Sequence, residues 1–561
     1  MDAAVSNPSQ SSTLEANGIG AEQPQEGGGS VRVPAESWYE ATQVPRPERP
    51  RLNFDLDVDV CVVGAGFAGL TAAREVARRG WSVAVVEANR VAWAASGRNT
   101  GFVLPGFAED IDDMVERIGL DHAKELWAQS ERGLRYVRET IAQTNMPGID
   151  PVPGWLFVSK TDDGRELPDM VERLRWIGAE VESWSPERVR AVLPSRAYFN
   201  AIHYPTAFHM HPLNYALGLA AAAEASGARI FENTPAISID PAGIRKRVVT
   251  PRGRVRAAHV VLAGNVHLGN LVPRLAATLL PITTYVMVTE PIGPMLHDVI
   301  RYRGAVSDGE RANNHYRIVG GDRLQWSGRM TVWESNPRWF ARGLVADIRR
   351  NFPELGTVKP AYIWPGTLGR SVHRMPQIGE VAPGVWIASG FGGHGLNTTA
   401  MGGELVARGI VERDQTWRLF APYELVWAGG ALGRVAAQGI YWATQPRLTM
   451  AQGLARYREQ ARRRKQTRLA AKRAKAGTAE VAKPATTLPR VEPAMPVLRA
   501  EPGELPAALA EIAAEAADSP TASPALEAAL DALPEPAKKR RKRGKKKRAS
   551  SWPANPDQND G

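Results

Sequence analysis

Cysteine is nearly absent from this sequence of 561 residues, in which Cys61 stands alone. A single cysteine excludes an internal disulfide framework and any metal site built from several thiolates. The first 36 residues lack a basic start followed by an apolar run, so no secretory signal is expected. Uncharged apolar runs are short as well, and none approaches the roughly 18 residues that would predict a transmembrane helix. These absences predict a protein of the reducing cytoplasm.

Most of the chain has almost no net charge, although the formal net charge of the whole sequence is +11. Residues 455–561 hold 23 basic and 13 acidic residues, a net charge of +10, which leaves +1 for everything before them. The basic residues concentrate at 455–475 and at 538–548, where ten of eleven are Lys or Arg. Such runs either stay solvated because like charges repel, or bind the phosphates of nucleic acid or of an anionic membrane surface. Both interpretations stay open, and neither bears on catalysis.

A dinucleotide-binding pattern opens the part of the sequence that has a globular composition. The apolar strand pattern Asp57–Val63 leads directly into Gly64-Ala-Gly66-Phe-Ala-Gly69, and a helix pattern follows from Leu70 to Arg79. The first glycine permits a tight turn, the second lets backbone approach a pyrophosphate, and the third lets the helix pack closely on the strand. The N-terminus of that helix offers free N–H groups to the anion.

Two further segments extend this pattern. The next strand, Ser82–Val86, ends at Glu87, which is placed to bind ribose hydroxyls. Far along the chain another strand, Val385–Ser389, enters the loop Gly390-Phe-Gly-Gly-His-Gly395 before a helix that starts near Thr398. Glycine-rich backbone at a helix N-terminus can approach a flat ring and donate hydrogen bonds to its carbonyls. The two ends of the folded region are therefore both expected to contact a flavin.

In this order the segments resemble the D-amino-acid oxidase and glycine oxidase superfamily of FAD enzymes. The closest resemblance is to amine oxidases of the gamma-glutamylputrescine oxidoreductase type. That closer similarity rests on a few short motifs, which are Ser96-Gly-Arg-Asn99, Leu262-Ala-Gly-Asn265 with Leu268-Gly269, Thr289-Glu-Pro291, and Trp364 with Gly366 before Met375-Pro376. The resemblance extends over residues 57–450.

The resemblance implies an α/β fold, in which a Rossmann-like FAD-binding domain with a parallel sheet is interleaved with an α+β substrate domain built on an antiparallel sheet. The FAD-binding domain is expected from residues 57–110, 200–270 and 371–412, and the substrate domain from 111–199 and 271–370. Residues 413–454 are expected to form a helical extension of this body. Residues 1–45 and the basic, Ala/Pro-rich tail 455–561 are predicted to be disordered, with a helix-like run at 455–475.

The implied cofactor is non-covalent FAD, because Cys61 lies in the strand before the glycines and residues 96–101 contain no His. The resemblance places some residues at the ADP half, some along the pyrophosphate, one at the adenine and the rest around the isoalloxazine. In chain order the expected FAD contacts are Gly64, Gly66, Ala68, Gly69, Glu87, Ala88, Ser96, Arg98, Asn99, Gly101, Ala236, Gly264, Gly390, Gly393, His394, Gly395 and Leu396.

The implied reaction takes a hydride from the carbon that bears a neutral amine, after which the imine hydrolyses and oxygen or another acceptor reoxidises the flavin. The candidate catalytic and pocket residues are Tyr316, Arg317, Trp326, Arg329, Trp364 and His394. Two of them have a plain structural alternative, because Trp326 and Trp364 also suit ordinary core packing. The pair His209 and His211 is expected at the start of a helix, and no metal site is predicted.

Two departures from relatives narrow the substrate. Leu368 stands where glycine oxidase-like enzymes carry an Arg that grips the substrate carboxylate, which favours an amine without an α-carboxylate. Residues 270–340 also lack the Lys that related oxidases keep near the flavin, so oxidase and dehydrogenase both stay open. An FAD-dependent amino-acid oxidase or dehydrogenase, with Arg317, Arg329 or Arg370 as its carboxylate clamp, is the alternative. A flavoprotein tethered to nucleic acid or membrane through its basic tail is the alternative of another class.

Overall fold

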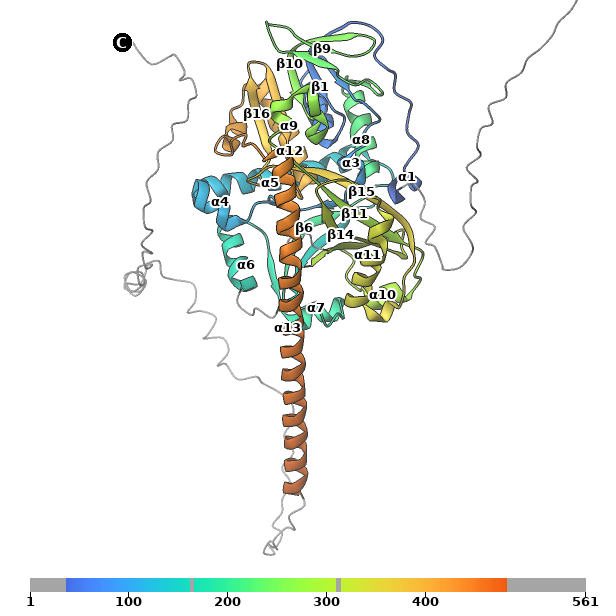
Figure 1. The fold of residues 1–561 in the computed structure, drawn as a ribbon, viewed down its shortest axis with the longest axis vertical. Coiled ribbons are helices and arrows are strands. Elements are labelled where there is room, and N and C mark those ends of the chain that lie inside the picture. The colour runs from blue at the N-terminus through green and yellow to red at the C-terminus, as the bar shows by residue number, and fades with distance from the viewer. Residues whose placement is uncertain (1–36, 162–165, 309–313, 482–561) are drawn as a thin grey trace, which may run out of the picture. The chain divides into compact units, whose positions relative to one another are not determined.

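The computed structural model describes residues 37–161, 166–308 and 314–481 (Figure 1). These residues contain two sheets, and the labels of Figure 1 place β1, β9 and β10 of one sheet above β11, β14 and β15 of the other. The α/β prediction with a parallel and an antiparallel sheet is thereby confirmed. The residues before 37 and after 481, for which disorder was predicted, lie outside the described part of the chain.

The first sheet is mostly parallel and contains the predicted dinucleotide-binding strand at its centre. Residues 56–63 pair in parallel with residues on both sides, so that Val60 lies opposite His259 and Val83. Within the described residues the strand order is β16 (Gln377–Ala382), β17 (Val385–Ser389), β10 (Arg254–Leu262), β1 (Leu56–Val63), β2 (Val83–Val86) and β7 (Arg229–Phe231). Two further strands branch from β10, because β9 (Lys246–Val249) pairs with β10 and β8 (Ser238–Asp240) pairs with β9. Strand β16 is antiparallel to β17, and all other pairings along the main path are parallel.

The second sheet is antiparallel except where β4 and β12 run parallel. Its described strands follow the order β15 (Pro360–Arg370), β11 (Leu280–Thr289), β14 (Arg323–Thr331), β13 (Asn314–Val319), β12 (Ala305–Asp308), β4 (Val152–Val158), β6 (Ala201–His209) and β3 (Phe102–Val103), with β5 (Glu182–Trp184) beside β6. The alternating or β-rich composition of residues 283–289, 315–319 and 323–329 predicts three strands, and these correspond to β11, β13 and β14.

Helices cover both sheets and connect them. The longer ones are α2 (Phe67–Arg78), α4 (Ile111–Ile118), α5 (Leu120–Thr144), α6 (Glu166–Trp176), α8 (Pro212–Ala225), α11 (Arg338–Asn351), α12 (Gly395–Val411) and α13 (Gly430–Val481). The short ones are α1 (Trp38–Ala41), α3 (Ala95–Arg98), α7 (Pro186–Val192), α9 (Pro273–Ala276), α10 (Met295–Val299), and the 3-10 turns η1 (Asn265–Leu271), η2 (Pro353–Leu355) and η3 (Thr416–Phe420). In the described residues no helix is long and apolar enough to cross a membrane.

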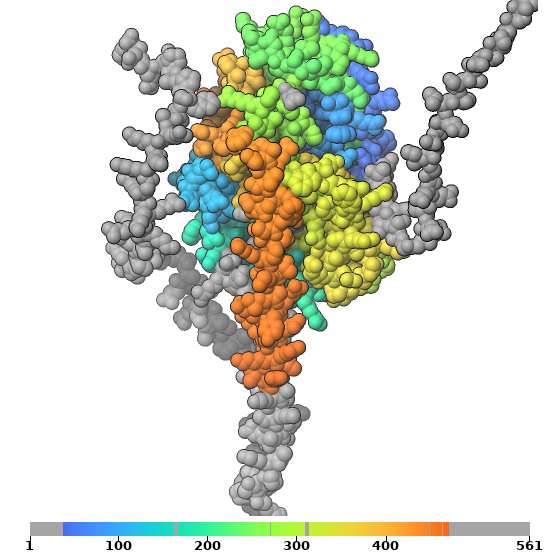
Figure 2. All heavy atoms as spheres, in the orientation of Figure 1, coloured from blue at the N-terminus to red at the C-terminus, as the bar shows by residue number. Residues whose placement is uncertain are grey.

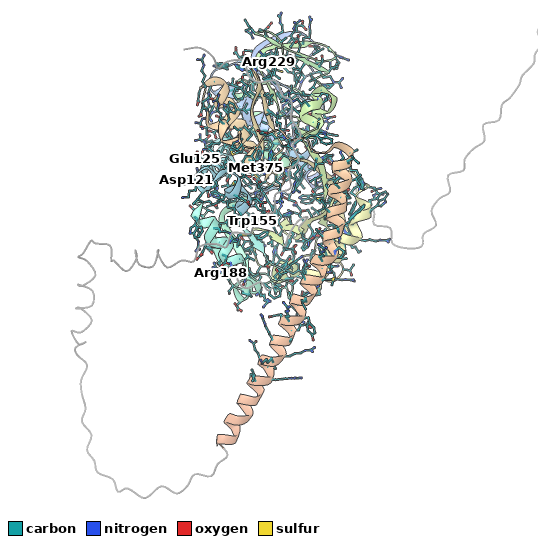
Figure 3. The ribbon with its side chains drawn as sticks, turned by 60° about the vertical axis from the view of Figure 1, so that its left-hand side comes forward. Asp121, Glu125, Trp155, Arg188, Arg229 and Met375 are labelled. Carbon is teal, nitrogen blue, oxygen red and sulfur yellow. The ribbon has the colours of Figure 1, made fainter. Side chains whose placement is uncertain are left out.

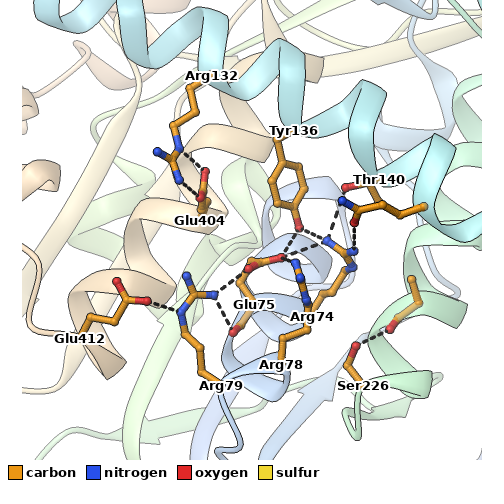
Figure 4. Close-up of polar contacts among 12 residues, drawn as sticks. Arg74, Glu75, Arg78, Arg79, Arg132, Tyr136, Thr140, Ser226, Glu404 and Glu412 are labelled. Atoms are coloured by element: carbon orange, nitrogen blue, oxygen red, sulfur yellow. Dashed lines mark hydrogen bonds and ion pairs between the residues drawn. The ribbon is translucent and has the colours of Figure 1, made fainter.

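Helix α2, which follows the glycine motif, is held to its neighbours by the buried carboxylate of Glu75 (Figure 4). Tyr136 of α5 donates to this carboxylate at 2.7 Å, and Arg74 and Arg79 donate to it at 3.0 and 2.6 Å. Burial alone would raise the pKa of Glu75, but these hydrogen bonds outweigh it and leave the pKa below its ordinary value. Arg79 also pairs with Glu412 at 2.6 Å just after α12. The network therefore fixes α2 against α5 and α12.

Three predicted segment boundaries are wrong. Residues 37–45 are not disordered, because Ser37 and Glu40 form a capping box for α1 and Tyr39 is fully buried. Strand β6 lies in the antiparallel sheet, where His209 pairs with Phe102, so the FAD-binding segment begins after His209 and not at residue 200.

At the other end, the helix-like run predicted at 455–475 is confirmed, and the helix extends to residue 481, so this part of the predicted disordered tail is ordered. They continue α13, which starts at Gly430, and the side chain of Glu459 pairs with Arg190 at 3.3 Å. The predicted extension 413–454 also contains a non-helical stretch, residues 421–429, between η3 and α13. A run of alanines with Arg and Lys has high helix propensity, which explains why the helix extends into the basic region.

Candidate active site

The glycine motif places the N-terminus of α2 at the carboxyl edge of the parallel sheet. Gly64 has φ +108°, and a Cβ on Gly69 would lie 2.0 Å from the carbonyl oxygen of Gly64. No side chain larger than hydrogen fits at Gly69, so the helix can approach the strand only with glycine there. Ala68 is buried in the same turn, and a Cβ on Gly403 of α12 would meet its carbonyl at 2.7 Å. This cradle has the form that a pyrophosphate requires.

Glu87 lies at the end of β2 as predicted. Its two oxygens accept hydrogen bonds from the backbone N–H groups of Ala65 and Asn89 at 2.8 and 2.9 Å, and burial raises its pKa. Ala88 follows in the same turn. Ala236 lies half-buried beyond β7, where Thr234 N–H donates to the carbonyl of Glu87 at 2.7 Å. The expected ribose and adenine contacts therefore belong to one corner of the sheet.

The turn 96–101 lies beside this cradle. Ser96 accepts a hydrogen bond from Phe67 N–H at 3.0 Å, so the two segments that are expected to contact FAD touch each other. Asn99 holds the turn itself, because its amide donates to the carbonyls of Ala95 and Ser96 and its oxygen accepts from Gly101 N–H. The carbonyl of Arg98 accepts a hydrogen bond from the Trp364 indole at 3.0 Å.

Trp364 is therefore a structural residue of this turn. It is 2% exposed and packs edge-on against Tyr39 with ring centroids 5.2 Å apart. These contacts favour ordinary core packing for Trp364 over a place in the wall of a substrate pocket.

The second glycine-rich loop adjoins the cradle through Asn265, at the turn after Gly264. The Asn265 side-chain oxygen lies 3.3 Å from Ser389 Oγ and accepts from Gly390 N–H at 3.4 Å, so it ties the turn after β10 to the loop after β17. Gly390 has φ +69°, and a Cβ at Gly393 or Gly395 would meet nothing within 4 Å. The loop thus borders open space, while Leu396 is buried in the core at the start of α12.

The pleat of the antiparallel sheet decides which candidate side chains reach this region. In β13 the side chains of His315 and Arg317 point to the face that carries the 96–101 turn, since Arg317 lies against Gly101 and His315 lies 5.9 Å from the Phe102 ring. Tyr316 points to the other face, where it stacks on Trp326 with ring centroids 4.4 Å apart. Successive residues of a strand alternate between faces, so both arrangements follow from one register.

Three predicted pocket residues are therefore wrong. Tyr316 and Trp326 are fully buried in the second core beside Phe352, on the face opposite to Arg317. Arg329 pairs with Asp347 of α11 at 2.6 Å and also donates to the Gly343 carbonyl at 3.1 Å. All three stabilise the packing of α11 and η2 on the sheet and cannot contact a ligand at the glycine-rich loops.

Arg317 is 5% exposed, and no carboxylate among the described residues pairs with it. Its guanidinium donates to His209 Nδ1 at 2.9 Å and to the Tyr39 hydroxyl at 3.2 Å, and its Nε has no hydrogen-bond partner in the described part of the chain. Gln325 accepts from the same tyrosine at 2.8 Å and donates to the Thr100 carbonyl. A buried cation surrounded by neutral groups favours an anionic or strongly polar ligand.

Two histidines lie on the same side of the sheet as Arg317. Burial lowers the pKa of His394 to about 4, and burial together with the nearby His394 lowers that of His315 to about 4. His394 Nδ1 has no hydrogen-bond partner in the described residues. Ser307 bridges His315 Nδ1 and the Trp155 indole N–H at 2.8 Å each, and the Trp155 and His394 rings are 6.4 Å apart. Figure 3 shows Trp155 within the body, between Arg229 above and Arg188 below.

Sequence reasoning missed several residues of this site. Tyr39 was assigned to a disordered segment, and His315 was assigned only to a strand; Trp155 and Gln325 carried no motif. The alternation of β13 around Arg317 could have identified His315, since residues two apart share a face. His211 lies at the start of α8 as predicted, where its Nδ1 accepts from Asn214 N–H at 3.1 Å, whereas His209 is the last residue of β6. No group of metal-binding residues occurs in the described ranges.

The residues fit FAD by three independent observations. The cradle of Gly64 and Gly69 excludes any Cβ, the loop at Gly393 and Gly395 borders open space, and His394 Nδ1 is a buried polar atom that needs a partner. The cradle lies where the resemblance implies the ADP half, and the loop with His394 lies where it implies the isoalloxazine, so both glycine-rich segments suit one cofactor site.

Comparison with known proteins gives matches over most of the chain. The profile of the family described as FAD dependent oxidoreductase (DAO) matches residues 59–408. Gamma-glutamylputrescine oxidoreductase of Escherichia coli (strain K12) is 32% identical over 427 residues, which cover 73% of this chain and 98% of that protein. Glycine oxidase of Geobacillus kaustophilus superposes with a TM-score of 0.55 at 20% identity, over 66% of this chain and 99% of the other. L-proline dehydrogenase of P.horikoshii also superposes with a TM-score of 0.55 at 20% identity, over 66% of this chain and 98% of the other.

Gly69→Ala is expected to lose the cofactor, because its Cβ would clash with backbone at 2.0 Å and push α2 away from β1. Overpacking of this kind costs about 1–3 kcal/mol, and it acts here at the pyrophosphate cradle. Flavin absorbance per protein and the thermal midpoint should both fall. The matched control is Gly439→Ala in α13, where a Cβ meets nothing within 4 Å. Full flavin content and an unchanged thermal midpoint in Gly69→Ala would contradict the claim that cofactor binding needs the close approach of α2 and β1 at Gly69.

The stability of the flavoprotein is expected to fall as the pH is lowered from about 6.5 toward 4. Burial lowers the pKa of His209 and His211 to about 3, and that of His315 and His394 to about 4. Over this range the unfolded chain binds protons at histidine, with a pKa of about 6.5, and the folded chain does not. The contribution of these four histidines to the free energy of unfolding is therefore fully present above about pH 6.5 and is lost as the pH falls toward 4.

Thermal midpoints across this pH range measure the effect. The thermal midpoint of the double variant His209→Gln, His211→Asn should fall less steeply on acidification than that of the wild type. Asn at position 211 keeps a capping side chain at α8. A midpoint that rises on acidification, or an equally steep fall in the double variant, would contradict the assignment.

Proposed function

Because the chain belongs to the FAD-dependent oxidoreductase family, whose profile matches residues 59–408, we propose that it oxidises the CH–NH bond of a primary or secondary amine. The protein is an FAD-dependent oxidoreductase that acts on amines or amino acids, and the proposal chooses between these substrates. An amine similar to gamma-glutamylputrescine is favoured, because the relative of that name is 32% identical over nearly its whole length. The imine that forms is hydrolysed by water.

FAD, when bound, supplies the hydride acceptor for the carbon that carries the amine. The residues proposed to hold it are the glycines of both loops, Glu87 and the 96–101 turn, which surround one region of the fold. Non-covalent attachment is proposed because Cys61 is fully buried in β1 and burial raises the pKa of its thiol to about 12. A thiol in that state is a poor nucleophile.

The observation that carries the proposal is the neutral imidazole of His394, whose Nδ1 lacks a partner in the described residues. Amines are mostly protonated in water, and a hydride can leave only from the neutral form. An imidazole with a pKa near 4 is neutral at physiological pH and can accept a hydrogen bond from the N–H of the entering amine at Nδ1, which positions the amine nitrogen. Trp155 and Phe102 border His394 and His315 with aromatic surface and exclude water from them.

Arg317 supports the amino-acid alternative. It is a buried cation without an acidic partner among the described residues, which suits a substrate carboxylate as well as the polar edge of a flavin. Leu368 argues the other way, because it stands where related glycine oxidases carry their carboxylate-binding Arg. Arg329, an earlier candidate for this clamp, is committed to Asp347.

The electron acceptor is proposed to be oxygen or a second protein or small molecule. Residues 270–340 contain no Lys, the residue type that related oxidases use to activate oxygen. Among described side chains, Arg317 is the buried cation that borders the 96–101 turn, so it could take over part of that role.

Anaerobic visible spectra during titration with a panel of amines and amino acids test the substrate class. An amine without an α-carboxylate is expected to bleach the flavin, and the amino acids are expected to leave its colour unchanged. Bleaching by amino acids alone would replace the proposed function with the alternative. Admission of air then separates the two acceptors, since rapid return of colour identifies an oxidase.

His394→Asn is expected to slow flavin reduction by about tenfold, because it disturbs the hydrogen bond that positions the amine nitrogen and such a bond is worth about 1.5 kcal/mol, with flavin content preserved. Stopped-flow reduction by the bleaching amine measures the rate. Trp326→Phe serves as the control, because Trp326 lies on the opposite face of the sheet and should leave the rate unchanged. Equal rates in His394→Asn and the wild type would remove His394 from the mechanism.

A further inference from the structure

Helix α13 packs on the body along one side only. On that side Gln438 is 1% exposed and accepts a hydrogen bond from Val332 N–H at 3.0 Å, Ala455 is buried, and Glu459 pairs with Arg190 at 3.3 Å. With 100° per residue these three positions fall on one flank of the helix. Figure 2 shows the helix in orange on the outside of the molecule. Its opposite flank therefore faces outward.

The outward flank carries a continuous row of large apolar side chains, here called the apolar strip. The strip consists of Leu432, Val435, Trp442, Met450, Leu454 and Tyr457, which are 79%, 67%, 60%, 74%, 49% and 68% exposed. Helical geometry places all six within an arc of about 120°. Trp427, just before the helix, is 66% exposed as well. A single exposed apolar residue needs no explanation, whereas a row of six along one helix face indicates a binding surface.

The strip ends where the basic part of the helix begins. Residues 455–475 contain ten Lys or Arg and one acidic residue, Glu459, and that residue is already paired with Arg190. Arg456 and Arg458 lie within the last turn of the strip itself. Apolar and aromatic side chains on one face, followed directly by a concentrated positive charge, form the pattern of helices that lie in the interface of a membrane.

Three kinds of partner can be compared on these two features. Nucleic acid would use the positive charge and leave the apolar strip in water. A second copy of the chain could cover the strip, but the basic residues would gain no partner of opposite charge. An anionic phospholipid surface uses both, because its phosphates attract Lys and Arg while Trp, Tyr, Leu and Met enter the boundary between headgroups and acyl chains.

We propose that α13 binds the surface of an anionic phospholipid membrane through its apolar strip and the basic residues that follow it. The helix lies in the plane of the interface and does not span the bilayer. The surface is formed by the outer flank of α13, and neither His394 nor Arg317 belongs to it, so the proposal does not depend on the substrate of the enzyme.

Sedimentation of the full-length flavoprotein with vesicles tests this proposal. Vesicles of phosphatidylcholine with phosphatidylglycerol should bind the protein at low salt, and vesicles of phosphatidylcholine alone should bind it at least about tenfold more weakly. The combined variant Leu432→Gln, Trp442→Gln, Met450→Gln should reduce binding to anionic vesicles by about tenfold or more. The matched control, Trp176→Gln with Trp339→Gln, removes side chains that are 65% and 75% exposed on α6 and α11 and should bind like the wild type.

Two further variants keep the test decisive. Arg462→Gln, Arg464→Gln, Lys465→Gln and Arg468→Gln together should weaken binding to a similar extent without removing any apolar contact. A chain that ends at residue 481 should bind like the wild type, because it retains all of α13. Flavin absorbance confirms that each protein is folded.

Several outcomes would overturn the proposal. Failure of the wild type to bind anionic vesicles would do so, as would binding that survives the strip variant or that disappears when residues 482–561 are removed. Strip-dependent dimers in light scattering without vesicle binding would identify a second copy as the partner. Binding of single-stranded RNA that is unaffected by the strip variant, in the absence of vesicle binding, would identify nucleic acid.

Discussion

Arg317 carries a positive charge into the interior of the protein, and much of the site depends on how that charge is accommodated. Its guanidinium binds His209 and Tyr39, both neutral, at 2.9 and 3.2 Å. A protonated His209 would stand against the same guanidinium, and this repulsion adds to burial in lowering the pKa of His209 to about 3. Tyr39 can reach Arg317 only because α1 is docked on the sheet. One buried cation thus links the N-terminal helix, β6 and the 96–101 turn.

The two faces of the antiparallel sheet differ in polarity, because successive side chains of its strands alternate between them. Arg317 and His315 lie on the face with the glycine-rich loops, while Tyr316 and its stacking partner Trp326 lie in a core with Phe352. The polar face needs a ligand to complete it, since His394 Nδ1 and Arg317 Nε have no partners in the described residues. The apolar face is complete without one. The sheet therefore separates the reactive site from the packing that supports it.

The fold could be predicted from the sequence because its signals are local. The spacing of Gly64, Gly66 and Gly69 after an apolar strand has one common structural solution, and the helix and second strand follow within 30 residues. The site was harder, because Tyr39, Trp155, Arg317 and His394 come from four separate segments and meet only in the folded chain. Arg317 was identified from its residue type. Tyr316 and Trp326 were wrongly included for the same reason, since a strand's side chains must be assigned to faces before their chemistry is considered.

The helix-like run predicted at 455–475 is confirmed, but the charge of this segment led to its assignment to a disordered tail. Long runs of like charge often indicate an unfolded tail, yet Ala, Arg, Lys and Gln are also strong helix formers. The early part of this helix is anchored through Gln438 and Glu459, and this anchoring lets the helix continue into the basic region. The sequence alone does not show which flank of α13 packs on the body, because this depends on contacts such as the hydrogen bond between Gln438 and Val332.

Arg317 is proposed to lie beside the bound flavin, and the reduction potential of that flavin tests this placement most directly. Charge close to the pyrimidine edge of a flavin tunes its electronics, and a cation there favours the reduced, anionic form. Arg317→Met should therefore lower the potential, whereas Arg329→Met, which removes an equal charge paired with Asp347 on the other face, should leave it unchanged. An unchanged potential in Arg317→Met, or an equal shift in both variants, would contradict the account.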